Sequence, residues 1–206
     1  MEAQKKLRWA VEAPGTRPIR TREWSPACRV LRYVVVVTLL SPLSFHSVND
    51  LEGYLYTVCE LANQVVKHRL PALPSEAEFI TCASTMSNTP SSIDMFAGEI
   101  LLPKPNSTFS TPYLYVSNRN DPSPEGDTIA IFSIVNPSRL ELVNEVRTGL
   151  NHVRGMEFGG VNDKWLVVGG LNAGGVKVFE RVDDGKGLKA IALNEDVAAP
   201  AGFLWT

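Results

Sequence analysis

The chain has 206 residues, of which 44 % are hydrophobic and 20 % are charged, a composition typical of one or two globular domains. Its 20 Lys and Arg residues nearly balance 22 Asp and Glu residues, and the resulting net charge of −2 argues against a basic nucleic-acid-binding domain. The three cysteines form no CxxC pair, which argues against a disulfide framework or a zinc site. We therefore expect three free thiols and a cytoplasmic protein.

The N-terminal segment, residues 1–44, differs from the rest of the chain. It is rich in Lys and Arg, and its prolines disfavour helix. The apolar run at residues 33–40 lies too far from the N-terminus for a signal peptide, and it is shorter than the roughly 20 residues that a membrane helix needs. Its valines favour a buried strand, while a poorly ordered or wrongly translated extension and a targeting element stay open as alternatives. We treat this segment as divergent or poorly ordered and expect no membrane association.

From residue 45 onward, a pair of short apolar strands is predicted three times, and each pair begins with an aromatic residue followed by Leu. The pairs start at Tyr54, Tyr113 and Trp165, so the repeat is about 50 residues long, as in four-stranded propeller blades. Hairpin turns and further alternating segments complete each blade. The predicted strands are 54–58, 65–69 and 79–83; 96–102, 113–117, 128–134 and 140–146; and 154–158, 165–169, 176–181 and 188–193.

The predicted fold is therefore all-β, a partial β-propeller of about three four-stranded antiparallel blades at residues 45–90, 91–150 and 151–206. The first strand of the first blade is unclear and is placed near Ser47. A closed ring needs at least four blades. An open arc would leave strand edges and apolar blade faces uncovered, and these would promote self-association.

The second unit carries two segments with a recognisable pattern. Residues 113–119 read YLYVSNR and residues 127–132 read DTIAIF. They resemble the LYVSNR and DSIAVF motifs of the lactonase family, seven-bladed β-propellers that include 6-phosphogluconolactonases and carboxy-cis,cis-muconate cyclases. The resemblance extends over residues 95–206 and, less closely, over 53–83, but not over 1–44. By this resemblance the chain corresponds to about the C-terminal half of a family member.

The resemblance implies an enzyme that opens or closes the lactone ring of an anionic sugar acid, or acts on a carboxymuconate, with no metal or cofactor. The substrate would be a small anionic lactone or muconate. Leu171 lies near the place where muconate-cyclising relatives can carry an acidic residue, which weakens the cyclase hypothesis. The alternative is a non-catalytic truncated propeller that acts as an interaction module or is an incomplete gene product.

Blade topology predicts where a site would lie. In a four-stranded meander, the turn between strands two and three lies on the same face as the connection from strand four to the next blade. Polar residues at such turns would rim one end of a central channel, where ligands commonly bind. In the second and third units these residues are Asn118, Arg119, Asn120, His152, Arg154 and Asn172, and the first unit adds Glu60 and Asn63.

Each candidate residue has a functional and a structural interpretation. The guanidinium of Arg119 would bind a carboxylate or phosphate and offset charge on a developing oxyanion, or else bond turn carbonyls. His152 would transfer a proton, since the ordinary pKa of histidine lies near neutrality, or else bond the backbone of its loop. Arg154 would contact the ligand or bridge two blades. Asn118 and Asn172 would help to bind substrate.

Overall fold

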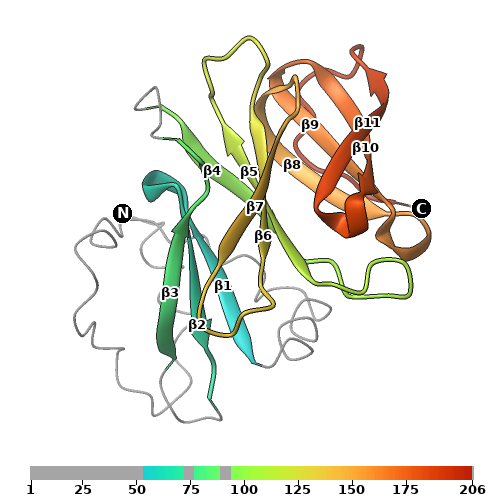
Figure 1. The fold of residues 1–206 in the computed structure, drawn as a ribbon. Helices are drawn as coiled ribbons and strands as arrows, with labels where there is room; N and C mark the ends of the chain where they lie inside the picture. Colours follow the sequence, from blue (N-terminus) through green and yellow to red (C-terminus); the bar gives the residue numbers. More distant parts are fainter. Residues whose placement is uncertain (1–52, 72–76, 89–93, 206) are drawn as a thin grey trace, which may run out of the picture.

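The computed structural model describes residues 53–71, 77–88 and 94–205, which form three antiparallel sheets. Figure 1 shows the sheets side by side like the blades of a fan. This arrangement confirms the predicted all-β, partial-propeller fold. The predictions for residues 1–44 and for a strand near Ser47 lie outside the described residues.

The first sheet contains three strands in the order β1-β2-β3. Its strands are β1 (Tyr54–Cys59), β2 (Gln64–Arg69) and β3 (Glu78–Ser84). They match the second, third and fourth strands predicted for the first blade. A single 3-10 turn, η2 (Glu60–Ala62), joins β1 to β2, and Asn63 follows it in the left-handed conformation that asparagine tolerates.

The second and third sheets are four-stranded meanders in which each strand pairs with its neighbours in sequence. The second contains β4 (Phe96–Leu101), β5 (Tyr113–Arg119), β6 (Thr128–Ser133) and β7 (Glu141–Arg147). The third contains β8 (Asn151–Gly159), β9 (Trp165–Ala173), β10 (Gly175–Val182) and β11 (Gly187–Asn194). Both therefore have the four strands predicted for a blade.

The second sheet is covered on both faces, and the alternation of side chains along β5 shows how. Leu114 and Val116 pack into the core against the first sheet, whereas Tyr113 and Tyr115 pack into the core against the third. All four side chains are buried. Two apolar cores, one on each side of the second sheet, thus hold the three sheets together.

Equivalent positions in the three sheets follow from the strand pairing. Tyr54, Tyr113 and Trp165 each begin a strand, namely β1, β5 or β9, that pairs with the strand that follows it in sequence. Counting from these residues, Arg119 at the end of β5 corresponds to Leu171 in β9 and to Glu60 after β1. The same count makes Asn118 equivalent to Gly170, and both pair with the first strand of their own sheet.

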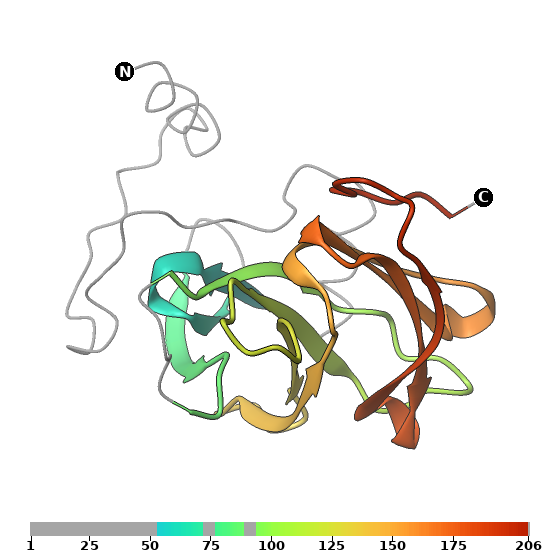
Figure 2. The same cartoon turned by 90° about the horizontal axis from the view of Figure 1, so that it is seen from above.

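The C-terminal segment, residues 199–205, repeats the start of β8 one sheet further on. His152 and Ala199 both have positive φ, at 60° and 49°. The carbonyl oxygen of Val153 lies against Ser117 of β5, and the carbonyl oxygen of Pro200 lies against the equivalent Gly169 of β9. The segment therefore lies where the first strand of a following blade would lie, and Figure 2 shows this chain end beside the third sheet.

Candidate functional site

The structure places four predicted site residues in strands rather than in the turns expected from the sequence, namely Asn118, Arg119, His152 and Asn172. Arg154 lies in a strand, as predicted. β5 runs through Arg119, so the turn begins only at Asn120. β8 starts at Asn151, and its pairing with β9 is irregular on both sides of Val153. A bulge leaves the extra residue unpaired while the strand continues, so His152 and Arg154 project from the ladder at these two points.

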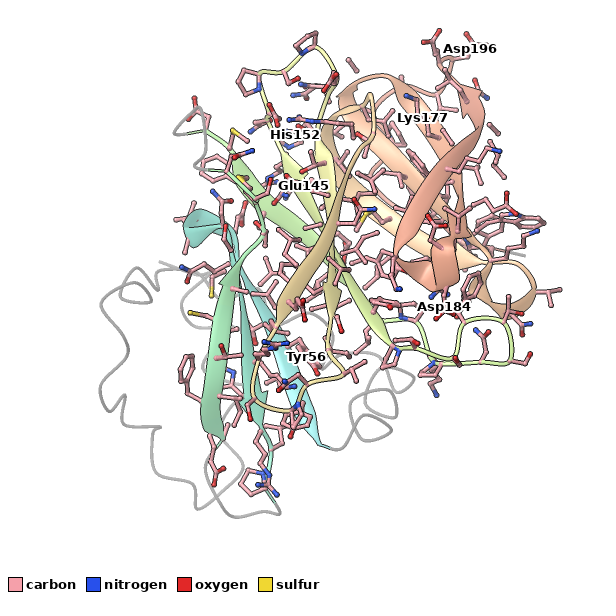
Figure 3. All side chains as sticks on the ribbon, viewed as in Figure 1. Tyr56, Glu145, His152, Lys177, Asp184 and Asp196 are labelled. Atoms are coloured by element: carbon pink, nitrogen blue, oxygen red, sulfur yellow. The ribbon has the colours of Figure 1, made fainter. Side chains whose placement is uncertain are left out.

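Arg119, His152 and Arg154 lie close together, and we call these three side chains the rim cluster. Burial lowers the pKa of His152 below its ordinary value of 6.5, and the positive charges of Arg119 and Arg154 lower it further. Figure 3 shows His152 at the upper end of the sheets and Asp184 at the lower end. The sheets thus bring together the proton-transfer and anion-binding candidates at one end.

Arg119 is held firmly at the end of β5. Its guanidinium forms an ion pair with Glu60 of the first sheet, and the side chain is only 11 % exposed. The guanidinium carbon lies 5.8 Å from the centre of the Phe96 ring. Its Nε is buried and has no hydrogen-bond partner among the described residues. The ion pair and the ring contact therefore hold Arg119 in a fixed position.

Arg154 differs from Arg119 because it is exposed and forms no ion pair with any residue in the described part of the chain. Its charge nevertheless acts on its neighbours, since it lowers the pKa of both Arg119 and His152 after the larger effect of burial. An unpaired guanidinium beside a histidine can bind an incoming carboxylate or phosphate through two parallel hydrogen bonds.

A fully buried carboxylate, Asp127, supports the rim cluster from below. Its two oxygens accept hydrogen bonds from the backbone N–H groups of Asp121 at 2.8 Å and Val153 at 2.9 Å. Burial raises the pKa of Asp127, and these N–H groups together with that of His152 lower it. Asp127 thereby ties the β5–β6 loop to the bulged start of β8.

Sequence reasoning did not identify Asp127, although a signal exists in the first sheet. Asn63 stands immediately before β2 as Asp127 stands immediately before β6. Its Nδ2 donates to the Met95 carbonyl at 2.8 Å, and its own carbonyl accepts from the N–H of Thr85. A polar residue before the third strand of two consecutive units thus marks a contact between neighbouring blades.

Asn118 and Asn172, the two asparagines predicted to bind substrate, lie outside the rim cluster. Asn118 is fully buried, and its Nδ2 donates to the Thr85 carbonyl at 2.7 Å and to Thr128 Oγ1 at 2.9 Å. Its side chain faces the first sheet, because side chains alternate along β5 and Asn118 lies on the same side of the strand as Leu114. Asn172 is exposed near the end of β9.

Two carboxyl groups on the first strands of their sheets have unusual pKa values. Burial raises the pKa of Glu99 on β4, and the charge of Glu157 on β8 raises it further, while the Ile100 N–H opposes this. Burial also raises the pKa of Glu157. Sequence reasoning did not identify either residue, because their proximity depends on the packing of β4 beside β8.

Among the described residues, no group of three or more His, Cys, Asp and Glu side chains is placed to hold a metal ion. Cys59 is buried and Cys82 is partly buried. No helix within the described ranges is long and apolar enough to span a membrane.

The fold and the rim cluster together define a class of protein: β-propeller blades that carry polar side chains at one end. Residues 43–205 match the sequence profile of the lactonase family, described as a seven-bladed β-propeller. The chain therefore belongs to the lactonase family. A comparison with curated protein sequences finds no significant match.

Solved structures with the same arrangement of blades include three that carry lactonase names. A putative 6-phosphogluconolactonase from Bacteroides uniformis is 25 % identical, with a TM-score of 0.55 over 72 % of this chain and 39 % of that one. A second from Bacteroides fragilis is 24 % identical, with a TM-score of 0.56 over 73 % and 38 %. A periplasmic gluconolactonase from Pseudomonas aeruginosa is 18 % identical, with a TM-score of 0.56 over 72 % and 38 %. The chain thus spans about two-fifths of the length of these structures.

Proposed function

We propose that this chain is a lactonase that hydrolyses the lactone ring of a small anionic sugar acid of the 6-phosphogluconolactone type. The observation that carries the proposal is the rim cluster, in which the charges of two guanidinium groups act on a histidine at one end of the blades. Membership of the lactonase family and the names of the similar structures support the same class of reaction.

In the proposed reaction, His152 acts as the base. Its pKa is lowered by burial and by the two arginines, so the imidazole is neutral at neutral pH and can accept a proton from water. The water oxygen attacks the lactone carbonyl carbon, and the carbonyl oxygen becomes an oxyanion. When the ring C–O bond breaks, the protonated imidazole returns its proton to the leaving alkoxide. The product is an open-chain hydroxy acid.

The arginines stabilise the negative charges in this reaction. Arg154 is exposed and unpaired among the described residues, so we assign it to the anionic substituent of the substrate. Arg119 is fixed by Glu60 and Phe96, so we assign it to the oxyanion, where a preorganised donor is most effective. Neither step requires a metal or an organic cofactor.

We favour hydrolysis over cyclisation of a carboxymuconate. The position equivalent to Arg119 in the third sheet is Leu171, and no acidic side chain takes its place. Cyclisation requires a proton to be delivered to carbon, and the rim cluster has only one group that titrates near neutral pH. Both substrates belong in the same assay, because they share an anionic group that Arg154 would bind.

The direct test is hydrolysis of 6-phosphoglucono-δ-lactone by the purified chain, measured against buffer. We expect a rate above buffer and a loss of roughly 100-fold or more in kcat for His152→Ala. Arg139→Ala is the matched surface control, since Arg139 is exposed and, within the described ranges, pairs only with exposed Glu141. A wild-type rate equal to that of buffer would refute the proposed function.

The outer face of the third sheet favours a second candidate function, an interaction module. On this face Trp165 is 36 % exposed, whereas the equivalent Tyr113 of the second sheet is 4 % exposed. Two copies that meet through this apolar face would give a defined dimer. Sedimentation at increasing concentration tests this, since a monomer at every concentration would rule it out.

We also propose a cytoplasmic location, because the odd number of cysteines and the lack of a CxxC pair in the sequence are unlike the disulfide frameworks of secreted proteins. Fractionation of cells that express the tagged full chain would test it. Recovery of the protein outside the cytoplasmic fraction would contradict the proposal.

A further inference from the structure

The side chain of His152 makes one hydrogen bond through its ring, and this bond determines where the ring carries its proton. His152 Nδ1 lies 2.6 Å from Oδ1 of Asn120. Asn120 Nδ2 donates in turn to the backbone carbonyl of Asp94 at 3.0 Å. The amide of Asn120 is therefore oriented by its own donor, because the reverse orientation would set its oxygen against a carbonyl oxygen.

Because Oδ1 of Asn120 can only accept a hydrogen bond, Nδ1 of His152 must donate one. A neutral imidazole carries a single N–H, so Nε2 then has a free lone pair. Nε2 has no hydrogen bond to any residue in the described part of the chain. The nitrogen that is free to accept a proton is thus selected by Asn120.

The backbone on both sides of this bond adopts a conformation that few residues take. Asn120 has φ of 62° and His152 has φ of 60°, both in the left-handed region. Asp127 holds the strained segment by accepting the N–H of Val153 at 2.9 Å. A strained segment that is held in this way is common where a side chain must be aimed at a ligand.

We propose that Asn120 is a positioning residue that holds His152 in the neutral form protonated at Nδ1 and leaves Nε2 as the base. This inference rests on the proposed function for its catalytic consequence, but not for the tautomer itself. Asn120 does not touch the substrate and acts only through His152. The groups that face His152 are Arg119 from β5, Arg154 from β8 and Asp127 from the loop before β6.

The test is the ¹⁵N NMR spectrum of the full chain with labelled histidine, which distinguishes Nδ1–H from Nε2–H imidazole. The chain has three histidines, and His152→Gln assigns the signal. We expect the Nδ1–H form in wild type and in Asn120→Asp, which keeps an acceptor, and the Nε2–H form in Asn120→Gly. Glycine tolerates positive φ, so this variant removes the amide without adding backbone strain.

Asn162→Gly is the matched control, because Asn162 also has positive φ, at 61°, but lies in the turn before β9. It should leave the spectrum of His152 and the rate unchanged. Asn120→Gly should lower kcat roughly tenfold and leave KM unchanged, as expected for the loss of one orienting hydrogen bond. Asn120→Asp should retain kcat above the pKa of His152 and move the acid limb of the rate to higher pH, since a carboxylate stabilises the imidazolium.

An Nε2–H signal in wild type, or an Nδ1–H signal that survives in Asn120→Gly, would overturn the inference. Either result is independent of lactone hydrolysis. Conversely, a wild-type chain without activity but with the expected spectra would refute the proposed function and leave the assignment of Asn120 intact.

Discussion

The third sheet has two neighbours, and the two contacts differ in chemistry although their backbones follow the same repeat. Toward the second sheet it meets Arg119, presents His152 and Arg154, and is tied by buried Asp127. Toward the C-terminal segment the equivalent positions carry only small or apolar residues. The equivalents of Arg119, His152, Arg154 and Asp127 are Leu171, Ala199, Ala201 and Gly174, respectively.

This difference separates what the repeat provides from what individual residues provide. The backbone contact survives in both places, since the carbonyl groups of Val153 and Pro200 lie at equivalent points of β5 and β9. The charged side chains occur in one place only. The blades therefore supply the scaffold, and the residues at these four equivalent positions make the two contacts chemically different.

The largest expected effect comes from removing the side chain of Asp127, which links the second and third sheets and has no counterpart beside the C-terminal segment. Asp127→Ala leaves the N–H groups of Asp121 and Val153 buried without an acceptor, so the free energy of unfolding should fall by about 3–5 kcal/mol. Urea denaturation measures this loss. Asp196→Ala changes an exposed carboxylate and should fall within about 0.5 kcal/mol of wild type. A loss below 1 kcal/mol for Asp127→Ala would contradict the role of the buried carboxylate.

A smaller effect concerns the choice of substrate. Arg154→Ala should lower kcat/KM for the phosphorylated lactone by roughly 10- to 100-fold, the value of one charge-assisted contact. Its effect on neutral glucono-δ-lactone should be less than about threefold, because that substrate has no anion to bind. The ratio of the two kcat/KM values is the measurement. Equal losses on both substrates would mean that Arg154 does not recognise the anion.

The packing of the C-terminal segment can be weakened separately. A Cβ on Gly159 would lie 2.2 Å from the Trp205 ring, which stacks on Trp165 at 6.2 Å between ring centres. Gly159→Ala should therefore displace the segment and lower the free energy of unfolding by about 1–3 kcal/mol. Gly202→Ala is the matched control, because no atom lies within 4 Å of its added Cβ. Equal stability of the two variants would argue against this packing.

The smallest expected effect is a pH shift. The pKa of His152 is lowered in the folded chain, so the neutral base persists below the ordinary value of 6.5. The rate kcat/KM should rise with pH through a single ionisation below pH 6.5 and then level off. The pH dependence of kcat/KM, obtained from initial rates, reports this pKa for the free enzyme. An ionisation above pH 7 would show that another group is the base.

The sequence predicted the strands well because alternation and turn residues act locally. It also contained the reason why Asn118 is buried. Asn118 lies two residues beyond Val116 on the same side of β5, so it faces the first sheet and not the rim. This alternation of side chains along β5 could have been predicted from the sequence alone.

Other features could not be read from the sequence, because they depend on how the sheets pack. The ion pair between Arg119 and Glu60 joins two sheets. The bulges that expose His152 depend on the register between β8 and β9, and the pairing of Asn120 with His152 depends on both. The sequence named the residues of the rim cluster, but not the contacts that orient them.

The central claim is that the rim cluster carries the chemistry. The most direct test replaces its three side chains by those at the equivalent positions beside the C-terminal segment. A single chain with Arg119→Leu, His152→Ala and Arg154→Ala carries at the rim the residues found at equivalent positions beside the C-terminal segment. We predict that it folds with the wild-type far-ultraviolet circular dichroism spectrum and hydrolyses 6-phosphoglucono-δ-lactone no faster than buffer. Wild-type hydrolysis by this folded variant would show that the chemistry lies elsewhere in the chain.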